Sequence, residues 1–438
     1  MALIVQKYGG SSVSDVEAIK RVAKRIVETR NAGHKLVVVV SAMGDTTDEL
    51  LDTAAQITDN APEREMDILL TAGERISMSL LSMAINELGV PAQAFTGAQA
   101  GIHTTSAYGR AQITGMVPER IARSISEGQV AIVAGFQGIS DNDDVTTLGR
   151  GGSDTTAVAL AAALHADVCE IYTDVDGLFS ADPRIVPKAH RLRSISTEET
   201  LELAAHGAKI LHLRAVEFAR RYKVPLHVRS SFSEKEGTWI SDRPASPALK
   251  GLVPDAAFLD PKEGQMEQPI ISGIAHDRGQ DKITVAGVPN HPGRAAMVFQ
   301  TIAAAGANID MIVQNIPVAD PTRANITFTI PEADAQVALD ALESAKEEIG
   351  FKEVRYNPNI GKLSLVGTGM RTNPGVAARL FAALSEAGIN IDLISSSEIR
   401  LSIVTKLDDL DRAVAVVHSA FGLDAEVSEA VVYAGTGR

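Results

Sequence analysis

A lysine and two glycines near the start of the chain form the first arrangement suited to chemistry. Residues 7–15 read KYGGSSVSD, in which a predicted strand leads through Gly9 and Gly10 into a predicted helix that begins near Ser12–Asp15. Glycines let the backbone approach an anion closely, and a helix N-terminus presents free N–H groups and a positive dipole. The GxxxxGK[ST] spacing of a Walker A loop is absent. The pattern favours a phosphate site in which Lys7 reaches a transferring phosphoryl group, and a tight structural turn is the alternative.

A second glycine pair stands before another helix. Residues 146–164 read TTLGRGGSDTTAVALAAAL. Ser153 or Asp154 as a helix cap is one explanation, but a cap requires neither Arg150 nor two glycines. Two glycine-to-helix junctions aimed at one place would bring two positive helix ends to a phosphate. Arg150 could then bind a carboxylate in bidentate fashion, and Asp154 could orient a lysine or hold water.

A third motif supplies an acid. Residues 70–77 read LTAGERIS and place Glu74 after a glycine at a predicted helix start. A first-turn acid that stabilises the helix dipole explains it. An anchor for a substrate ammonium group explains it equally well, so both interpretations stay open.

The end of a later strand offers candidates for nucleotide contacts. Residues 171–186 read IYTDVDGLFSADPRIV, a strand that ends at Thr173 and Asp174 and a turn that carries Arg184. Strand ends of a parallel sheet line the ligand crevice, so the first two could meet adenine or ribose and Arg184 the phosphates. Lys209 follows on a predicted helix, and a solvated surface charge is the alternative for it.

The segments between these motifs predict a parallel α/β sheet. Apolar runs at 36–40, 130–134, 168–173 and 225–228 alternate with longer Ala- and Leu-rich segments of helical spacing. Strands that are apolar at nearly every position are buried on both faces. The alternation of strands and helices therefore predicts a mostly parallel sheet with helices on both sides.

Composition limits the class of protein. The 438 residues are 45% hydrophobic, enough for two or three domains, and the net charge of −14 argues against a nucleic-acid partner. No apolar stretch reaches the roughly 20 residues of a membrane span, and the first is too short for a signal peptide. Cys169, the single cysteine, is predicted to be buried, which fits a reducing cytoplasm. We expect a cytoplasmic protein without a membrane partner.

An internal repeat follows a segment at 233–268 that is predicted to be a linker with a short strand. An offset of 82 residues aligns Pro292 with Pro374 and the Asn-Ile-Asp run at 308–310 with that at 390–392. The residue pattern of each unit predicts a strand, an amphipathic helix that starts at Pro-Gly and ends at a glycine C-cap, and another strand. Two copies can pair with a ligand at their seam, and a purely structural duplication is the alternative.

Several motifs together resemble the aspartokinase family, in the feedback-regulated actinobacterial type with tandem ACT domains. They are, in order, KYGGSS, SAMGDTTDEL, LLTAGERIS, TTLGRGGSDTTA, YTDVDGLFSADPRIV, GAKILH and VRSSF. The resemblance implies an α/β fold, an amino-acid-kinase (carbamate-kinase-like) αβα sandwich followed by two ferredoxin-like ACT domains of βαββαβ topology. The expected ranges are 1–245 for the catalytic domain, 246–267 for the linker, and 268–350 and 351–438 for the ACT domains.

The resemblance also implies ATP-dependent phosphorylation of L-aspartate to 4-phospho-L-aspartate, the first step of lysine, threonine and methionine biosynthesis. The catalytic residues would be Lys7, which stabilises charge on the γ-phosphoryl group, and Asp154, which orients Lys7. Mg²⁺ would bridge the ATP phosphates, since the sequence shows no dedicated metal cage. The residues expected to contact ATP are Lys7, Gly9, Gly10, Ser11, Thr173, Asp174, Phe179, Arg184 and Lys209.

Aspartate would be held by its two α-substituents, the carboxylate on Arg150 and the ammonium on Glu74. The residues expected around it are Ser41, Thr47, Glu74, Arg150, Gly151, Gly152 and Ser153. A carboxylate is already a nucleophile at neutral pH, so the enzyme must mainly bring two anions together with positioned cations.

The resemblance to ACT domains implies effector pockets between the loop before each first helix and the strand after it, with lysine and threonine as feedback inhibitors. The expected residues are Asn290, Ala295, Asn308, Ile309, Asp310 and Gln314 in the first copy and Val376, Ala377, Asn390, Ile391 and Ser397 in the second. Asp310 or an amide would pair with the effector's ammonium group. Relatives often have aspartate where this chain has Asn290.

Assembly and competing functions remain open. The KEG triplet before Met266 can be encoded by a purine run like a ribosome-binding site, which suggests an internal start, a short regulatory subunit and an α2β2 assembly. A homo-oligomer with an ordinary linker methionine is the alternative. Another amino-acid kinase would usually lack the tandem repeat. A catalytically silent sensor would be expected to lose Lys7, Glu74, Arg150 or Asp154, all of which are present.

Overall fold

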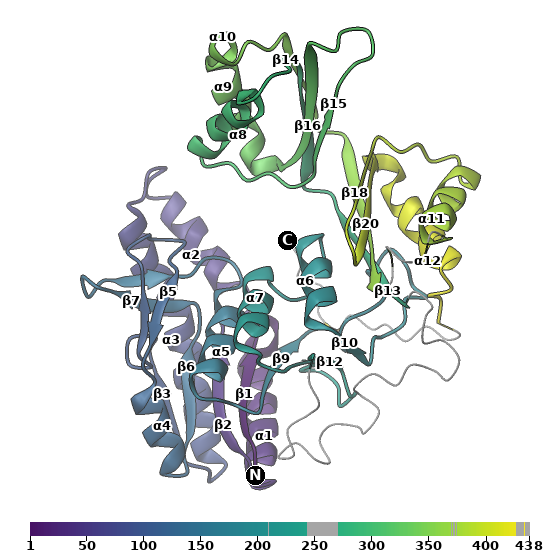
Figure 1. Cartoon of the computed structure of the whole chain (residues 1–438). Coiled ribbons are helices and arrows are strands. Elements are labelled where there is room, and N and C mark those ends of the chain that lie inside the picture. The colour runs from purple at the N-terminus through teal and green to yellow at the C-terminus, as the bar shows by residue number, and fades with distance from the viewer. Residues whose placement is uncertain are drawn as a thin grey trace. The chain divides into compact units, whose positions relative to one another are not determined.

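The computed structural model describes residues 1–208, 210–242, 270–368, 370, 373, 375–425 and 433. They fall into two compact units, which are drawn in Figure 1. The first unit comprises Met1–Pro183, Pro187–Met266 and Asp424–Arg438, and the second comprises Arg184–Val186 and Glu267–Leu423.

The first unit is built on an eight-stranded sheet. Its strands are β1 (Leu3–Tyr8), β2 (Lys35–Val40), β3 (Ala92–Phe95), β6 (Val130–Ala134), β9 (Val168–Thr173), β10 (Ser194–Ile195), β11 (Leu226–Ser230) and β12 (Thr238–Ile240). Their order is β10-β12-β11-β9-β1-β2-β6-β3, and every pair is parallel except β11–β12. The four apolar runs are thus confirmed as strands, and β12 is the short strand expected inside the segment at 233–268.

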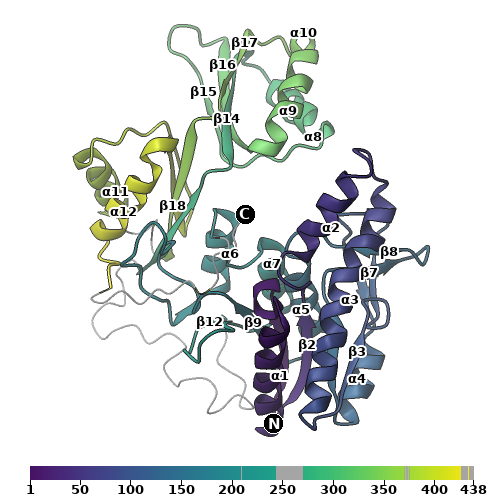
Figure 2. The ribbon, with the colours of Figure 1, turned by 180° about the vertical axis from the view of Figure 1, so that it is seen from behind.

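Helices cover both faces of this sheet (Figures 1 and 2). They are α1 (Val16–Asn31), α2 (Thr46–Ala55), α3 (Glu63–Glu87), α4 (Glu119–Ser126), α5 (Gly152–Ala163), α6 (Thr197–Ala205) and α7 (Leu213–Tyr222), with a 3-10 turn η1 (Gly10–Val13) after β1. Helices α1 and α3 share one core with the sheet, in which Ile19, Val22 and Leu81 pack against Val38. On the opposite face α5 lies between the sheet and α7, and burial on all sides explains why it is apolar all round.

By length and composition α3 would also pass as a membrane-crossing helix, and it is the one such case among the described helices. Its length and apolar composition are weak evidence for a membrane span, because helices in protein cores share them. Leu81 and Ile85 of α3 are fully buried in the core of the sheet, which accounts for the apolar sequence. Cys169 is also buried, as its apolar surroundings predicted.

A small second sheet extends the first unit. Its strands are β4 (Ile102–Thr104), β5 (Ile113–Met116), β7 (Gln137–Ser140) and β8 (Val145–Thr147), in the order β5-β4-β7-β8. Asp67 of α3 is fully buried and ties this sheet to the helix. Its carboxylate accepts hydrogen bonds from the Gly109 N–H at 2.9 Å and from the Thr147 N–H and hydroxyl at 2.8 and 2.6 Å.

Asp67→Ala is therefore expected to lower the free energy of unfolding by about 2–4 kcal/mol, because buried donors lose their acceptor. Urea unfolding followed by circular dichroism measures it. Asp52→Ala, at an exposed position of α2, is the control and should stay within about 0.5 kcal/mol of the wild type. Equal effects of the two substitutions would contradict the structural role of Asp67.

The second unit contains the two repeats. The first repeat has the βαββαβ order expected for an ACT domain and forms the sheet β15-β16-β14-β17. Its elements are β14 (Gln280–Pro289), α8 (Arg294–Ala304), β15 (Ile312–Asn315), β16 (Arg323–Pro331), α9 (Glu332–Ser344), α10 (Lys346–Ile349) and β17 (Glu353–Asn357). The second repeat has β18 (Ile360–Thr368), α11 (Gly375–Glu386), β19 (Leu393–Ser396), β20 (Arg400–Lys406), a 3-10 turn η3 (Leu407–Asp409) and α12 (Leu410–Ala420).

One strand crosses the boundary expected between the repeats. Strand β13 (Ile270–Asp277) lies within the range 268–350 expected for the first ACT domain. It nevertheless pairs antiparallel with β18, with Ile274 opposite Leu365, in the sheet β13-β18-β20-β19. The first repeat is thus inserted after an edge strand of the second sheet. A strand pattern predicts a strand but not the sheet that it joins, so this pairing could not be predicted from the sequence.

Candidate active site

The carboxyl ends of the central strands bring the predicted motifs to one edge of the sheet. The loops after β1 and β9 are neighbours there because the two strands pair in parallel. Lys7, near the end of β1, extends its ammonium group to Asp154 in the first turn of α5, with 2.7 Å between Nζ and Oδ1. Both side chains are largely buried, at 13% and 12% exposure. The two residues predicted to be catalytic are therefore in direct contact.

The loop after β1 packs tightly against the loop after β2. The Gly44 N–H donates to the Gly10 carbonyl at 3.1 Å. A Cβ atom on Gly10 would lie 2.9 Å from the Gly44 carbonyl oxygen and 3.1 Å from that of Ala42. Close backbone approach, more than turn geometry alone, therefore requires glycine at this position.

Gly10→Ala is expected to lower kcat/KM for ATP by at least about 10-fold, because a shift of this loop misplaces the backbone and Lys7. Initial-rate kinetics at varied ATP concentration measures the effect. Gly115→Ala is the control, since a Cβ atom there meets only His103 Cβ at 4.0 Å. Wild-type kinetics for Gly10→Ala would show that the loop tolerates the displacement.

The helix start predicted near Ser12–Asp15 agrees with the structure, in which a separate 3-10 turn precedes the helix. The 3-10 turn η1 begins after Gly9, with no side-chain cap, whereas α1 begins only at Val16 and is capped by Asp15, which accepts the Ala18 N–H. The Asp15 carboxylate already serves the N-terminus of α1. An anion between the two glycine junctions would therefore meet η1 and not α1.

The second junction differs from the capped helix considered as its alternative. Gly151 occupies the N-cap position of α5 with a left-handed φ of 69°, and no side chain caps the helix. The expectation that Ser153 or Asp154 caps α5 is therefore wrong, since both lie inside its first turn. A Cβ atom on Gly151 would lie 2.0 Å from His212 Cγ, so glycine is needed for packing as well as for φ. The start of α5 remains suited to an anion.

Glu74 lies in the middle of α3, so its expected position at a helix start is wrong, and with it the first-turn dipole interpretation. The Gly73 before it lies within the same helix and does not precede it. The Glu74 side chain is 3% exposed, and Oε1 accepts the Ala42 N–H at 3.2 Å. Oε2 is buried and has no hydrogen-bond partner in the described structure. Burial raises the pKa of Glu74 to about 7.

Helix α3 is fixed to the end of β2 at this point. The Ser77 hydroxyl donates to the Ser41 carbonyl at 2.6 Å. Ser41 and Glu74, both expected around aspartate, are thus held where α3 meets the two residues that follow β2. A buried carboxylate oxygen without a partner is costly and fits a cation that arrives with a ligand.

The nucleotide candidates lie across β1 from this acid. The Thr173 hydroxyl donates to Asp174 Oδ1 at 3.0 Å, and the Thr173 carbonyl accepts the Ser231 N–H at 2.9 Å. Ser231 also accepts a hydrogen bond from Ser12 at 2.8 Å between the hydroxyl oxygens. Ser12 and Ser231 were not among the predicted site residues. The signal for Ser231 was available, because it directly follows β11 at the same sheet edge.

The remaining predicted site residues differ in their burial and in the element or unit to which they belong. Phe179 is buried and pairs through its backbone with Arg191. Arg150 is exposed just before the start of α5, and Thr47 lies in the first turn of α2. Arg184 belongs to the second unit, and Lys209 and Met266 lie outside the described residues.

A cavity of about 500 Å³ in the second repeat brings together three predicted effector residues, Val376, Ala377 and Ser397. It lies between α11, β19 and β20. Glu398 and Arg400, which were not predicted, also line it and contribute opposite charges.

The aspartates of the two Asn-Ile-Asp runs form reciprocal ion pairs between the repeats. Asp310 of the first repeat pairs with Lys362 of β18 at 2.5 Å, and Lys362 is 1% exposed. Asp392 of the second repeat pairs with Lys282 of β14 at 2.7 Å. The cation next to Asp310 is therefore supplied by the chain itself, whereas the Asn290 amide donates to the Pro321 carbonyl.

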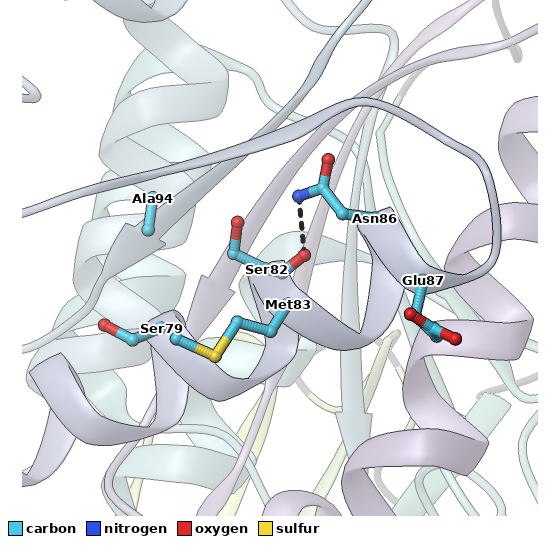
Figure 3. A pocket seen from close by; sticks show the side chains of 6 residues that line it. All are labelled: Ser79, Ser82, Met83, Asn86, Glu87 and Ala94. Atoms are coloured by element: carbon cyan, nitrogen blue, oxygen red, sulfur yellow. Dashed lines mark hydrogen bonds between the residues drawn. The ribbon is translucent and has the colours of Figure 1, made fainter.

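A different pocket lies at the far end of α3. Figure 3 shows its lining by Ser79, Ser82, Met83, Asn86, Glu87 and Ala94, with a volume of about 550 Å³. The Asn86 amide donates to the Ser82 carbonyl at 2.8 Å. None of the predicted site residues lines this pocket, and it contains no glycine junction or lysine. We do not assign the reaction to it.

The fold and site together define an amino-acid kinase domain followed by two ACT domains. A family model described as "Amino acid kinase family" matches residues 2–230, and one described as "ACT domain" matches residues 283–345 and 363–421. The aspartokinase of Mycolicibacterium smegmatis is 58% identical over 439 residues, covering all of both chains. The chain belongs to the aspartokinase family, and it is a phosphotransferase with a carboxyl group as acceptor.

Solved structures agree with this assignment. Escherichia coli aspartokinase III in complex with aspartate and ADP (R-state) superimposes with a TM-score of 0.78 at 25% identity, over 96% of this chain and 100% of that chain. The same enzyme in complex with lysine and aspartate (T-state) gives a TM-score of 0.67 at 25% identity, over 95% and 99%.

Proposed function

We propose that the chain transfers the γ-phosphoryl group of MgATP to the β-carboxylate of L-aspartate, as the first step of lysine, threonine and methionine biosynthesis in the cytoplasm. The observation that carries the proposal is the Lys7–Asp154 contact of 2.7 Å at the uncapped start of α5. A cation beside a positive helix end can stabilise a transferring phosphoryl group, which supports the proposal. The aspartate and ADP bound to the related Escherichia coli enzyme support the choice of substrates.

The reaction follows from charge. A β-carboxylate oxygen of aspartate forms a bond to the γ-phosphorus while the bond from that phosphorus to the β,γ-bridging oxygen breaks and ADP leaves. The attacking group is ionised at neutral pH, so no general base is needed. Lys7 offsets the developing negative charge, Asp154 fixes the direction of its ammonium group, and Mg²⁺ enters with ATP on its phosphates.

Aspartate is oriented by its α-substituents. Glu74 presents its unpaired Oε2 to the α-ammonium group, and Arg150 binds the α-carboxylate. Ser41, which is tied to α3, helps to shape the same end of the site. The ATP contacts we propose are those named from the resemblance, with Thr173 and Asp174 at the adenosine end.

We propose further that lysine and threonine inhibit through the repeats. The cavity of the second repeat offers Glu398 for an ammonium group and Arg400 for a carboxylate, the two groups common to every free amino acid. The lysine bound in the T-state of the related Escherichia coli enzyme supports lysine as one effector. Inhibition requires each effector to bind the less active arrangement better than the active one.

Hydroxamate trapping of the acyl phosphate tests the reaction. Purified full-length protein with MgATP and L-aspartate should give product, L-glutamate should not replace aspartate, and lysine with threonine should lower the yield. If the hydroxamate yield is the same with and without lysine and threonine, the kinase proposal stands and the assignment of these effectors is excluded. Absence of product under all conditions would leave a catalytically silent sensor as the better interpretation.

The assembly is a separate proposal. We propose an oligomer, either of this chain alone or as α2β2 with a short subunit that starts near Met266. Replacing the Met266 codon by one for leucine should remove a short product from an expression gel and leave the full-length band. If no short product exists before the replacement, the internal start is excluded and the homo-oligomer stands.

A further inference from the structure

The segment that follows the second repeat returns to the first unit and contacts the end of β9. The Tyr433 N–H donates to the Asp174 carbonyl at 3.0 Å. Its hydroxyl donates to Asp176 Oδ2 at 3.4 Å, and its ring stacks on Phe232 with 5.9 Å between centroids and 14° between planes. A backbone contact, a side-chain contact and a ring contact therefore all converge on one residue.

The surface that receives Tyr433 is built from buried and mutually bonded groups. Asp176 is 1% exposed and accepts hydrogen bonds from Ser233 Oγ at 2.5 Å and Lys235 Nζ at 2.8 Å. The Arg21 guanidinium of α1 lies 4.9 Å from the centroid of the Phe232 ring. Tyr433 thus joins a cluster that links α1, the loop after β9 and the segment after β11.

The same segment has a second anchor near the start of its path. Asp424 forms a backbone bridge with Ala189, and the Ala425 N–H donates to the Lys188 carbonyl at 2.8 Å. These contacts and those of Tyr433 flank the stretch from Asp174 to Ala189. Asp424 and Ala425 therefore contact one end of this stretch and Tyr433 the other.

We infer that Tyr433 is a positioning residue for the nucleotide. The inference rests on the proposed function, in which Thr173 and Asp174 meet the adenosine part of ATP. The Tyr433 N–H fixes the backbone of Asp174, and its hydroxyl and ring fix the segment that carries Asp176 and Phe232. Without these contacts the loop keeps the hydrogen bonds that Ser233 and Lys235 donate to Asp176 but loses its support at Asp174 and Phe232. More of the loop must then be ordered when the nucleotide binds, which weakens binding.

The test uses the full-length protein and MgADP as the probe, with calorimetric titration and steady-state kinetics. Tyr433→Ala is expected to raise the Kd for MgADP and the KM for ATP by about 10-fold, since the ring contact with Phe232 and the hydroxyl's hydrogen bond to Asp176 are lost. The KM for aspartate should change less than about 2-fold. Tyr222→Ala, an exposed tyrosine of α7, is the matched control and should behave as the wild type.

A second variant removes the same stacking contact from the other side. Phe232→Leu should also raise the Kd for MgADP. If Tyr433→Ala proves unstable in a melting experiment, the result for Phe232→Leu tests the inference. MgADP binding that is unchanged or tighter in both variants would overturn the inference. The proposed function would still stand in that case if the wild-type protein forms hydroxamate. A wild type that forms no hydroxamate and binds no MgADP would remove the proposed function and this inference together.

Discussion

Lys7→Met is expected to lower kcat for aspartate phosphorylation by at least about 100-fold while the protein remains folded. Two anions must approach each other in this reaction, and Lys7 is the cation that the structure places at the junction of β1 and α5. Methionine retains an unbranched apolar side chain of similar size and removes the ammonium group with its charge. Single-turnover phosphoryl transfer measures the chemical step directly.

Lys20→Met is the control for the loss of one lysine, because Lys20 lies on the exposed side of α1, where it pairs with Glu17. It should stay within about 2-fold of the wild type. Asp154→Asn should fall between the two, since the ammonium group remains but loses the anion that directs it. A Lys7→Met enzyme with nearly full kcat would mean that the phosphoryl charge is stabilised by other groups.

Much of this site was predictable because strand ends are readable from sequence. The run that became β2 is apolar at nearly every position, and those that became β1, β9 and β11 contain shorter apolar stretches. Parallel strands place their carboxyl ends on one edge of the sheet. Lys7 and Asp154 follow from that rule together with the glycine junctions. The contact between them depends on α5 packing back onto β1, which alternation of strands and helices already predicts.

Other features depend on tertiary contacts that leave no local signal. Glu74 was expected at a helix start because it follows a glycine. In the structure α3 runs through both residues, and the glycine lets the helix pack closely on the loop after β2. Strand β13 could pair in the sheet of either repeat, since both sheets have similar strand patterns, and it pairs with β18 of the second. The reciprocal pairs Asp310–Lys362 and Asp392–Lys282 require both repeats to be placed first.

The second large effect concerns Glu74. Glu74→Gln is expected to raise the KM for aspartate by at least about 30-fold with little change in the KM for ATP, because the α-ammonium group loses a buried anionic partner. Glutamine retains an oxygen that can accept the Ala42 N–H, so the loop after β2 stays in place. Glu87→Gln, at an exposed position of the same helix, is the control. An unchanged KM for aspartate would place the ammonium group elsewhere.

The raised pKa makes aspartate binding depend on pH. Burial sets the pKa of Glu74 at about 7 in the free enzyme, and the ammonium group pairs with the ionised form. The KM for aspartate should therefore be flat from about pH 7.5 to 8.5 and rise by about 10-fold per pH unit well below 7. Initial rates at saturating ATP across this range measure it, and Glu74→Gln should remove this slope.

The effect of the same substitution on stability should have the opposite sign. Because the folded protein raises the pKa of Glu74 from 4.5 to about 7, it binds more protons than the unfolded chain between these values. The stability is therefore undiminished below about pH 4.5 and falls as pH rises through about 7, by about 3 kcal/mol in total. Glu74→Gln should thus melt at a higher temperature than the wild type at pH 8, with the difference shrinking toward pH 5. A purely structural glutamate would lose stability when replaced, so a variant that gains stability while it loses aspartate binding identifies Glu74 as a residue maintained for its ligand.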